Sequence, residues 1–234
     1  MNPTIKYLFL FFSALFFISC NANSQAGVLS ATEFEQKMTA PKVQLLDVRT
    51  AGEYQTAHLP NALQANWLDQ AQFADRTQYL DKSLPVLIYC ASGVRSGQAM
   101  QALKAQGFKE VYNMGGGLST WKMEGKPVIA TNPPAELTVP AFQSMINGAK
   151  VALVDIGAEW CPPCKKMEPV LQQLQKEMGS AYTFVKVDGG NDITVMKYLN
   201  FVALPTFIVF KDGKETWRKQ GIVALDELKK AIGQ

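Results

Sequence analysis

The chain has 234 residues, of which 47% are hydrophobic and 18% are charged, and its formal net charge is +3. This composition is too apolar for a disordered protein, and the length suits two ordinary globular domains. The charge is small and comes without a dense run of lysine and arginine. The sequence therefore gives no indication of a nucleic-acid partner.

The N-terminal segment has the pattern of an export signal. Lys6 precedes an apolar run from Tyr7 to Ile18. That run is shorter than the roughly 20 apolar residues needed to span a bilayer, but it suits the core of a secretory signal. We therefore expect an exported, periplasmic protein.

The end of this signal allows two interpretations. Phe17-Ile18-Ser19-Cys20 resembles a bacterial lipobox, with Phe17 in place of the usual leucine. The resemblance implies a signal peptide over residues 1–20, lipidation of Cys20 as a membrane anchor, and a polar tether over residues 21–27. The alternative is cleavage after Ala22, which would leave a soluble periplasmic protein.

The following segment alternates strand-like and helix-like patterns. Val43–Val48 and the more hydrophobic Pro85–Tyr89 predict strands. The spacing of apolar residues predicts a helix over Ser96–Gln106, and Gly107 lies where a C-terminal cap belongs. Strands that alternate with helices imply an α/β domain with a mostly parallel sheet and helices on both faces.

Cys90 lies where a predicted strand turns into this helix. A short loop that opens on a helix N-terminus exposes a sulfur to unpaired backbone N–H groups and to the helix dipole. We therefore expect the pKa of the Cys90 thiol to fall. Gly93 lets the loop curl, and Arg95 can offer paired donors to an anionic substrate. The alternative is a buried cysteine that only packs.

This segment resembles the rhodanese family over about residues 28–130. The motifs that carry the resemblance are Asp47-Val48-Arg49, Glu53-Tyr54, His58-Leu59-Pro60-Asn61-Ala62, the Cys90–Arg95 loop, and Met114-Gly115-Gly116-Gly117 followed by Trp121. The resemblance implies sulfane-sulfur transfer through a persulfide on Cys90. Arg95 is then a catalytic residue, and the substrate-binding loop comprises Ala91, Ser92, Gly93 and Val94.

Loop length and two neighbouring residues refine this interpretation. Four residues separate Cys90 from Arg95, whereas related phosphatases have five, so we expect sulfur transfer rather than phosphate hydrolysis. Arg49 and Glu53 are four residues apart, and we expect them to form a structural ion pair. His58 is the only histidine, and we expect an architectural role for it because a persulfide cycle needs no adjacent base.

The Pro-Pro pair in Thr131–Pro134 predicts a linker, which we place over residues 131–137 before a second domain over 138–234. In that domain we expect strands over Val151–Ile156, Tyr182–Val187 and Thr206–Phe210. We expect helices over Cys164–Met178 and Leu225–Ile232. We predict a mixed sheet flanked by helices.

Cys161 and Cys164 form a Cys-x-x-Cys pair at the start of the longer helix. A zinc site would need a second pair of ligands, and haem attachment would need a histidine where Lys165 stands. A structural disulfide stays possible, although so small a loop constrains the unfolded chain little. We favour a redox pair, in which Cys161 attacks a partner disulfide and the shielded Cys164 resolves the mixed disulfide. We expect no cofactor and no metal.

Residues 138–234 resemble thioredoxin. The resemblance implies that Asp155 helps to deprotonate Cys164, with Lys186 as its partner. It also implies a client-binding surface, which comprises Trp160, Leu204, cis-Pro205 and Gly221. Gly157 replaces a flanking aromatic residue, and we expect a site open to bulkier partners. Pro162 stands where the family more often has glycine.

Together the patterns predict a periplasmic thiol-disulfide oxidoreductase linked to a thiosulfate-type sulfurtransferase. The expected partners are client protein thiols and disulfides, a small sulfane-sulfur donor, and a membrane-bound reductase. The alternative is a thioredoxin-like oxidoreductase whose first domain only binds partners. Alkylation of Cys90 at neutral pH would distinguish the two, because slow labelling would favour the binding domain.

Overall fold

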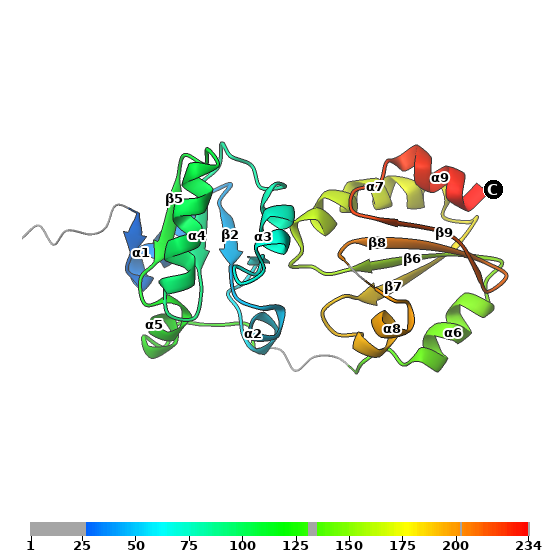
Figure 1. Cartoon of the computed structure of the whole chain (residues 1–234), viewed down its shortest axis with the longest axis horizontal. Coiled ribbons are helices and arrows are strands. Elements are labelled where there is room, and N and C mark those ends of the chain that lie inside the picture. Colours follow the sequence, from blue (N-terminus) through cyan, green and yellow to red (C-terminus); the bar gives the residue numbers. More distant parts are fainter. Residues whose placement is uncertain (1–26, 131–134, 202, 234) are drawn as a thin grey trace, which may run out of the picture.

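The computed structural model describes residues 27–130, 135–201 and 203–233 (Figure 1). The predicted signal peptide, Cys20, the tether up to residue 26 and Thr131–Pro134 lie outside the described residues. Within those residues, no helix combines the length and hydropathy that crossing a membrane requires.

The first domain has a five-stranded, all-parallel sheet in the order β1-β5-β4-β2-β3. Its strands are β1 (Val28–Leu29), β2 (Gln44–Asp47), β3 (Leu63–Gln64), β4 (Val86–Tyr89) and β5 (Val111–Met114). Its helices are α1 (Ala31–Met38), α2 (Ala51–Thr56), α3 (Gln70–Thr77), α4 (Val94–Ala105) and α5 (Gly117–Met123). Side chains of α1, α2 and α5 pack in one apolar cluster, and those of α3 and α4 pack in another.

Local sequence signals fix several of these elements. Helices α1 and α2 each begin with a capping box, in which Ser30 and Thr50 exchange hydrogen bonds with the glutamate three residues later. All four residues of β4 are buried, as expected for a central parallel strand. Gly107 has a φ of +92° just after α4, so it ends that helix in the left-handed conformation that glycine favours.

The second domain has a four-stranded mixed sheet in the order β7-β6-β8-β9. Strand β6 (Val151–Gly157) is parallel to β7 (Thr183–Asp188) and antiparallel to β8 (Thr206–Lys211), which pairs with β9 (Lys214–Gln220). Helices α7 (Pro162–Met178) and α9 (Leu225–Gly233) pack on one face. Helices α6 (Val139–Asn147) and α8 (Ile193–Tyr198) pack on the other.

The predicted α/β fold class is confirmed for both domains, and each predicted strand and helix overlaps an observed one. The predicted helix at Cys164 begins earlier, at Pro162, because Pro162 and Pro163 occupy its first turn, where their missing N–H groups are not needed. The short elements β1, β3, α2 and α8 carry too few residues to show a period, and the sequence did not reveal them.

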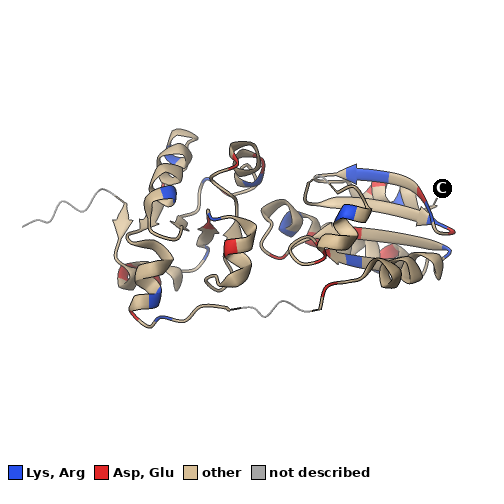
Figure 2. Ribbon diagram, turned by 60° about the horizontal axis from the view of Figure 1, so that its bottom comes forward, with Lys and Arg blue, Asp and Glu red and all other residues tan. Residues whose placement is uncertain are grey.

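The two domains meet through α2, β3 and α3 of the first and the segment that precedes α7 of the second (Figure 1). The Gln64 backbone N–H donates to the Trp160 carbonyl at 2.7 Å. The Tyr54 ring lies 5.9 Å from the Trp160 ring, centroid to centroid. Acidic and basic residues are interspersed over both domains (Figure 2).

Candidate functional site

Cys90 lies in the loop that joins β4 to α4. Its Sγ accepts hydrogen bonds from the Gly93 backbone N–H at 3.1 Å and from the Ser96 hydroxyl at 3.3 Å. Gly93 has a φ of +87°, and its carbonyl accepts a hydrogen bond from the Asn113 side chain at 3.1 Å. The loop therefore wraps around the sulfur and points donors from the first turn of α4 at it.

These donors decide the ionisation of Cys90. Burial raises the pKa of the thiol, since the side chain is 0% exposed. Hydrogen bonds from Ser96 and from the backbone N–H groups of Ser92 and Gly93 act in the opposite direction and outweigh burial. The net result is a pKa below the ordinary value, which agrees with the expectation from the helix N-terminus.

The first turn of α5 fixes the same loop from the other side. The Leu118 N–H donates to the Cys90 carbonyl at 2.8 Å, and the Ser119 N–H donates to the Ala91 carbonyl at 3.0 Å. Gly117 has a φ of +58°, and a Cβ there would lie 2.4 Å from the Cys90 carbonyl oxygen. Only glycine at position 117 lets the backbone of α5 come this close to the Cys90 carbonyl, so Gly117 helps to hold the Cys90–Arg95 loop in place.

Arg95 lies beside Cys90, but its main partner is Glu53 of α2. The two side chains form a bidentate ion pair at 2.9 and 2.6 Å, and this pair lowers the pKa of Glu53 to about 2. Contact with Glu53, and to a lesser extent with Cys90, raises the pKa of Arg95. The Glu53 carboxylate therefore fixes the Arg95 guanidinium next to the Cys90 sulfur.

The predicted ion pair between Arg49 and Glu53 is wrong. Arg49 binds Asp47 at 2.5 Å and donates to the Ala57 carbonyl at 2.6 Å, and it is buried among these partners. Asp47 is the last residue of β2, and the Arg49 side chain binds it from two residues further along the chain. Glu53 lies in the first turn of α2 and pairs with Arg95 instead.

His58 lies at the domain boundary. Its ring stacks on Tyr54 at 3.8 Å between centroids, and Nδ1 lies 2.9 Å from the Tyr54 carbonyl oxygen. Burial lowers the pKa of His58. The ring lines a cleft between the domains of about 470 Å³, together with Tyr54 and Gly157. This placement fits the expected architectural role.

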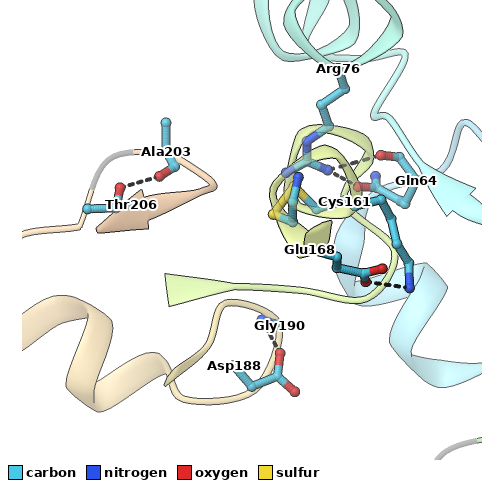
Figure 3. The surroundings of a disulfide bond; sticks show 10 residues. Gln64, Arg76, Cys161, Glu168, Asp188, Gly190, Ala203 and Thr206 are labelled. Atoms are coloured by element: carbon cyan, nitrogen blue, oxygen red, sulfur yellow. Dashed lines mark hydrogen bonds and ion pairs between the residues drawn. A yellow bond between two sulfur atoms is a disulfide. The ribbon is translucent and has the colours of Figure 1, made fainter. Parts of the chain in front are cut away.

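Cys161 and Cys164 form a disulfide at the start of α7 (Figure 3). Cys161 is the N-cap residue, and its Sγ accepts a hydrogen bond from the Cys164 N–H at 3.4 Å. Both Cys90 and Cys161 thus accept the N–H of the residue three positions later, at the N-terminus of a helix.

Asp155 lies in β6, paired in register with Lys186 of β7. Burial raises the pKa of Asp155 to about 6, and the charge of Lys186 partly opposes this rise. Asp155 lines a cavity against α7 together with Glu168 and Leu171. It can therefore hold or release a proton near neutral pH beneath the helix that carries the disulfide.

The loop before β8 contains the cis peptide between Leu204 and Pro205, as the resemblance to thioredoxin implied. The Gly221 N–H donates to the Pro205 carbonyl at 2.8 Å, so Gly221 borders this loop. Figure 3 places Ala203 and Thr206 around the disulfide. Of the predicted client-binding residues, Trp160 and Leu204 belong to the same apolar cluster as Cys161.

The expectation of an open redox site with a shielded Cys164 is wrong for this domain arrangement. Cys161 is 0% exposed, whereas Cys164 is half-buried. The cause is the first domain, because Gln64 and Arg76 lie among the residues around the disulfide (Figure 3). Gly157 faces the cleft shared with that domain and not open solvent.

The structure does not bring the two predicted centres together. Cys90 packs with the side chains of α3 and α4, and Cys161 belongs to a separate apolar cluster that runs from the first domain into the second. Helix α2 contacts both neighbourhoods, because Glu53 binds Arg95 and Tyr54 touches Trp160.

Three residues at these sites had no role in the sequence analysis, namely Ser96, Gln64 and Arg76, and Glu53 was assigned to the wrong partner. Ser96 lies in the predicted helix one residue after Arg95, and a polar residue in the first turn was the only signal for it. Gln64 and Arg76 act across a domain boundary, which no local pattern encodes. Among the described residues, no group of three or more His, Cys, Asp or Glu side chains could hold a metal ion.

Comparisons with known proteins divide the chain in the same way. A model of the rhodanese-like domain matches residues 30–124, and a thioredoxin model matches residues 133–234. The thiosulfate sulfurtransferase GlpE of Coxiella burnetii is 41% identical over 98 residues, which are 42% of this chain and 86% of that protein. The thioredoxin of Chlamydia trachomatis is 39% identical over 84 residues, which are 36% of this chain and 81% of its own length.

Two further matches lie in the second domain. Chloroplastic thioredoxin Y of Oryza sativa subsp. japonica is 35% identical over 92 residues, and this chain spans only 55% of its length. A solved structure of Plasmodium falciparum thioredoxin is 32% identical and covers 41% of this chain and 91% of its own, with a TM-score of 0.37. Each of these relatives aligns with less than half of this chain.

Proposed function

Because the chain belongs to the rhodanese family through its first domain and to the thioredoxin family through its second, we propose that it is a periplasmic thiol-disulfide oxidoreductase with a linked thiosulfate-type sulfurtransferase. Sulfurtransferase and thiol oxidoreductase chemistry in general follow from the two families. The donor, the compartment and the coupling of the two reactions are our proposal.

One observation carries it. Each of the two sulfurs accepts a backbone N–H at the N-terminus of the helix that follows it: Cys90 from the N-cap residue Gly93, and Cys161 from Cys164 in the first turn. Such donors stabilise a thiolate, which is the nucleophile in both sulfur transfer and disulfide exchange. The first domain adds the Ser96 hydroxyl and the Arg95 cation at the sulfur where an anionic donor would bind.

In the first reaction, the Cys90 thiolate attacks the outer sulfur of thiosulfate. The new S–S bond makes a persulfide on Cys90, the S–S bond of thiosulfate breaks, and sulfite leaves with the electron pair. Arg95 balances the negative charge of the donor, and the N–H groups of the loop stabilise the persulfide anion.

In the second reaction, the Cys161 thiolate attacks a disulfide or the Cys90 persulfide. A client disulfide gives a mixed disulfide and one client thiol, and attack by Cys164 on the Cys161 sulfur then releases the second thiol. With the persulfide, the two protein thiols are oxidised to the Cys161–Cys164 disulfide, Cys90 returns to the thiol, and hydrogen sulfide is released. Asp155 can accept the Cys164 proton.

The coupled reaction requires the two sulfurs to come together. Since Cys90 and Cys161 are both buried and lie in separate clusters, the domains must rearrange before Cys161 can attack. Their link in one chain keeps the effective concentration of each centre high for the other.

The coupling is tested by following the mass of the Cys90 peptide during turnover with thiosulfate and a dithiol reductant. In Cys161→Ser we expect persulfidated Cys90 to accumulate, whereas the wild type should keep it low. Cys164→Ser serves as the matched control, since it retains the attacking sulfur and should trap a mixed species. Equal persulfide levels and equal turnover in the wild type and Cys161→Ser would contradict the coupling.

A second candidate is a thioredoxin-like oxidoreductase whose first domain only binds partners. The observation that favours it is the contact of Gln64 and Tyr54 with Trp160, in which the first domain binds a surface next to the redox pair. Alkylation of reduced Cys90 at neutral pH distinguishes the candidates. Labelling faster than that of a free thiol supports the sulfurtransferase, and slow labelling that does not accelerate with rising pH supports the binding domain.

We also propose export through the N-terminal signal, anchoring through a lipid on Cys20, and a membrane-bound reductase as electron source. The apolar run Tyr7–Ile18 and the segment Phe17–Cys20 support this proposal. Expression in a bacterium that is fed a labelled fatty acid tests it. The wild type should incorporate the label and Cys20→Ser should not, and an unlabelled wild-type protein would contradict the lipid anchor.

A further inference from the structure

Arg76 of α3 is a buried cation without a carboxylate at its head group. Its residue is 6% exposed. Among the ion pairs of the described residues, none involves Arg76 within the 4.0 Å limit. Only the more distant charges of Asp75 and Asp69 favour its ionised form. A buried charge in this position is costly unless another group compensates it.

The groups that hold Arg76 are neutral. Nη1 donates to the Gln64 side-chain oxygen and to the Gln64 carbonyl, the latter at 3.2 Å. The guanidinium carbon lies 4.9 Å from the centre of the Trp160 ring, across the domain boundary. Burial lowers the pKa of Arg76 to about 10. The site thus fixes the orientation of the cation but leaves its charge uncompensated.

The position of Arg76 suggests what compensates it. Figure 3 shows its side chain reaching from α3 toward the disulfide, with Gln64 beside it. Trp160, on which it stacks, immediately precedes Cys161. Two-electron reduction by a dithiol breaks the Cys161–Cys164 bond, which leaves Cys164 protonated and a thiolate on Cys161. An anion then appears beside the unpaired cation.

We propose that Arg76 is a positioning residue of the redox centre, supplied by the first domain, and that its guanidinium is the counter-ion of the Cys161 thiolate while the domains are docked. This inference rests on the proposed function, since it takes Cys161 as the redox nucleophile. It goes further because it makes the redox centre a composite site, with Cys161 and Cys164 from the second domain and Arg76 from the first.

Two consequences follow from the charge balance. Docking favours the reduced centre, because the thiolate gains a partner that the disulfide lacks, so the docked protein is a stronger oxidant than the undocked one. By linkage, reduction tightens the contact between the domains and oxidation loosens it. Oxidation of the redox pair during exchange therefore weakens the contact with the first domain, which otherwise covers Cys161 and keeps the next partner away from it.

The test measures the thiolate of Cys161 in the full chain with Cys20→Ser and Cys90→Ser together as background, so that thiolate absorbance near 240 nm reports the redox pair alone. We compare Arg76→Met, which keeps length and removes charge, with Arg76→Lys, which keeps charge. Arg218→Met is the matched control, since Arg218 lies on β9 and pairs with Glu215. Small-angle scattering records whether the domains stay docked.

We expect Arg76→Met to raise the midpoint of the titration by about one pH unit, and Arg76→Lys to restore most of it. The equilibrium with glutathione should shift toward the disulfide by up to about tenfold, which corresponds to about 30 mV. Arg218→Met should match the background protein. An unchanged midpoint in Arg76→Met, docked or not, overturns the inference, and so does an equal rise in Arg76→Lys, which would assign the effect to the contact and not to the charge.

Failure of the proposed function gives a different result. If Cys161 is not a redox nucleophile, the parent protein itself shows no exchange with glutathione and no thiolate below the ordinary thiol range. If the parent exchanges with glutathione and Arg76→Met behaves like it, the oxidoreductase assignment stands and only the role of Arg76 is lost.

Discussion

The Cys90 loop and the Cys161 turn use the same element of structure in two different settings. Both place a sulfur at the N-terminus of a helix and give it a backbone N–H from that terminus. The Cys90 site is complete within one domain, because Ser96, Arg95 and Glu53 all come from it. The Cys161 site is bordered by both domains, with Gln64 and Arg76 from the first (Figure 3).

The difference separates what a helix terminus provides from what its surroundings add. The helix gives each sulfur donors and a favourable dipole. The surrounding side chains then determine which charged groups lie near each sulfur and which partners can reach it. At Cys90 the nearby arginine, Arg95, is paired with the carboxylate of Glu53, whereas at Cys161 the nearby arginine, Arg76, stacks on Trp160 and has no carboxylate partner.

The most direct way to break the comparison is to remove each sulfur separately. Cys90→Ser should lose sulfur transfer from thiosulfate, and Cys161→Ser should lose disulfide reduction, each by about a thousandfold or more, since the nucleophile is gone. The measurements are sulfite release from thiosulfate and reduction of a protein disulfide. Loss of both reactions in either variant would show that the two sites are not chemically separate.

Asp155→Asn should change the pH dependence of stability in the second domain and leave that of the first domain unchanged. The pKa of Asp155 lies at about 6 in the folded protein, above its ordinary 3.8, so the folded state binds the proton more tightly than the unfolded state. Stability therefore falls as the pH rises from 4 to 6, and the ionised carboxylate costs up to about 3 kcal/mol above that range.

We expect Asp155→Asn to be more stable than the wild type at pH 8 and equal to it below pH 4, as measured by urea unfolding of the second domain. Asp226→Asn is the control, because Asp226 is exposed. A stability gain that persists unchanged at low pH would contradict the assigned ionisation.

Gly117→Ala should damage the Cys90 site alone. The new Cβ would meet the Cys90 carbonyl oxygen and the Gly93 nitrogen at 2.4 and 2.7 Å, in a left-handed conformation that alanine avoids. We expect a loss of about 2 kcal/mol in the stability of the first domain and slower sulfur transfer. Gly107→Ala shares the positive φ without the clash, so an equal loss there would assign the effect to the backbone conformation alone.

The smallest effect is expected from Ser96→Ala, which removes the hydroxyl donor from Cys90. Loss of this donor should raise the pKa of the thiol, so the rate of sulfur transfer at neutral pH should fall by up to about tenfold and its pH profile should move to higher pH. Ser83→Ala, in an exposed turn, is the control. A lower rate with an unmoved profile would mean that Ser96 only shapes the loop.

Much of this picture could be predicted from the sequence. The buried strands β4 and β6 are visible as near-continuous apolar runs, and the long amphipathic helix α7 has enough residues to reveal its period. The position of Cys90 and of the Cys161–Cys164 pair after such strands located both sites. Helix α2 has six residues and β3 has two, so neither element showed a period.

The partners of charged residues were harder to predict. Arg49 and Glu53 have the spacing of a helical pair, but Arg49 precedes α2 and binds Asp47. Arg76 showed no signal at all, because its surroundings exist only after two separately folded domains meet. Contacts between domains depend on surface shape, which a single sequence does not display in any local period.

The central claim is that the N-termini of two helices favour the thiolates of Cys90 and reduced Cys161 over their thiols. The most direct test is site-resolved alkylation of the reduced full chain, in which mass spectrometry follows each cysteine peptide across a pH series. Our account predicts that both alkylation midpoints lie below that of a free thiol, whatever the absolute rates. Midpoints at or above the free-thiol value for both cysteines would contradict it.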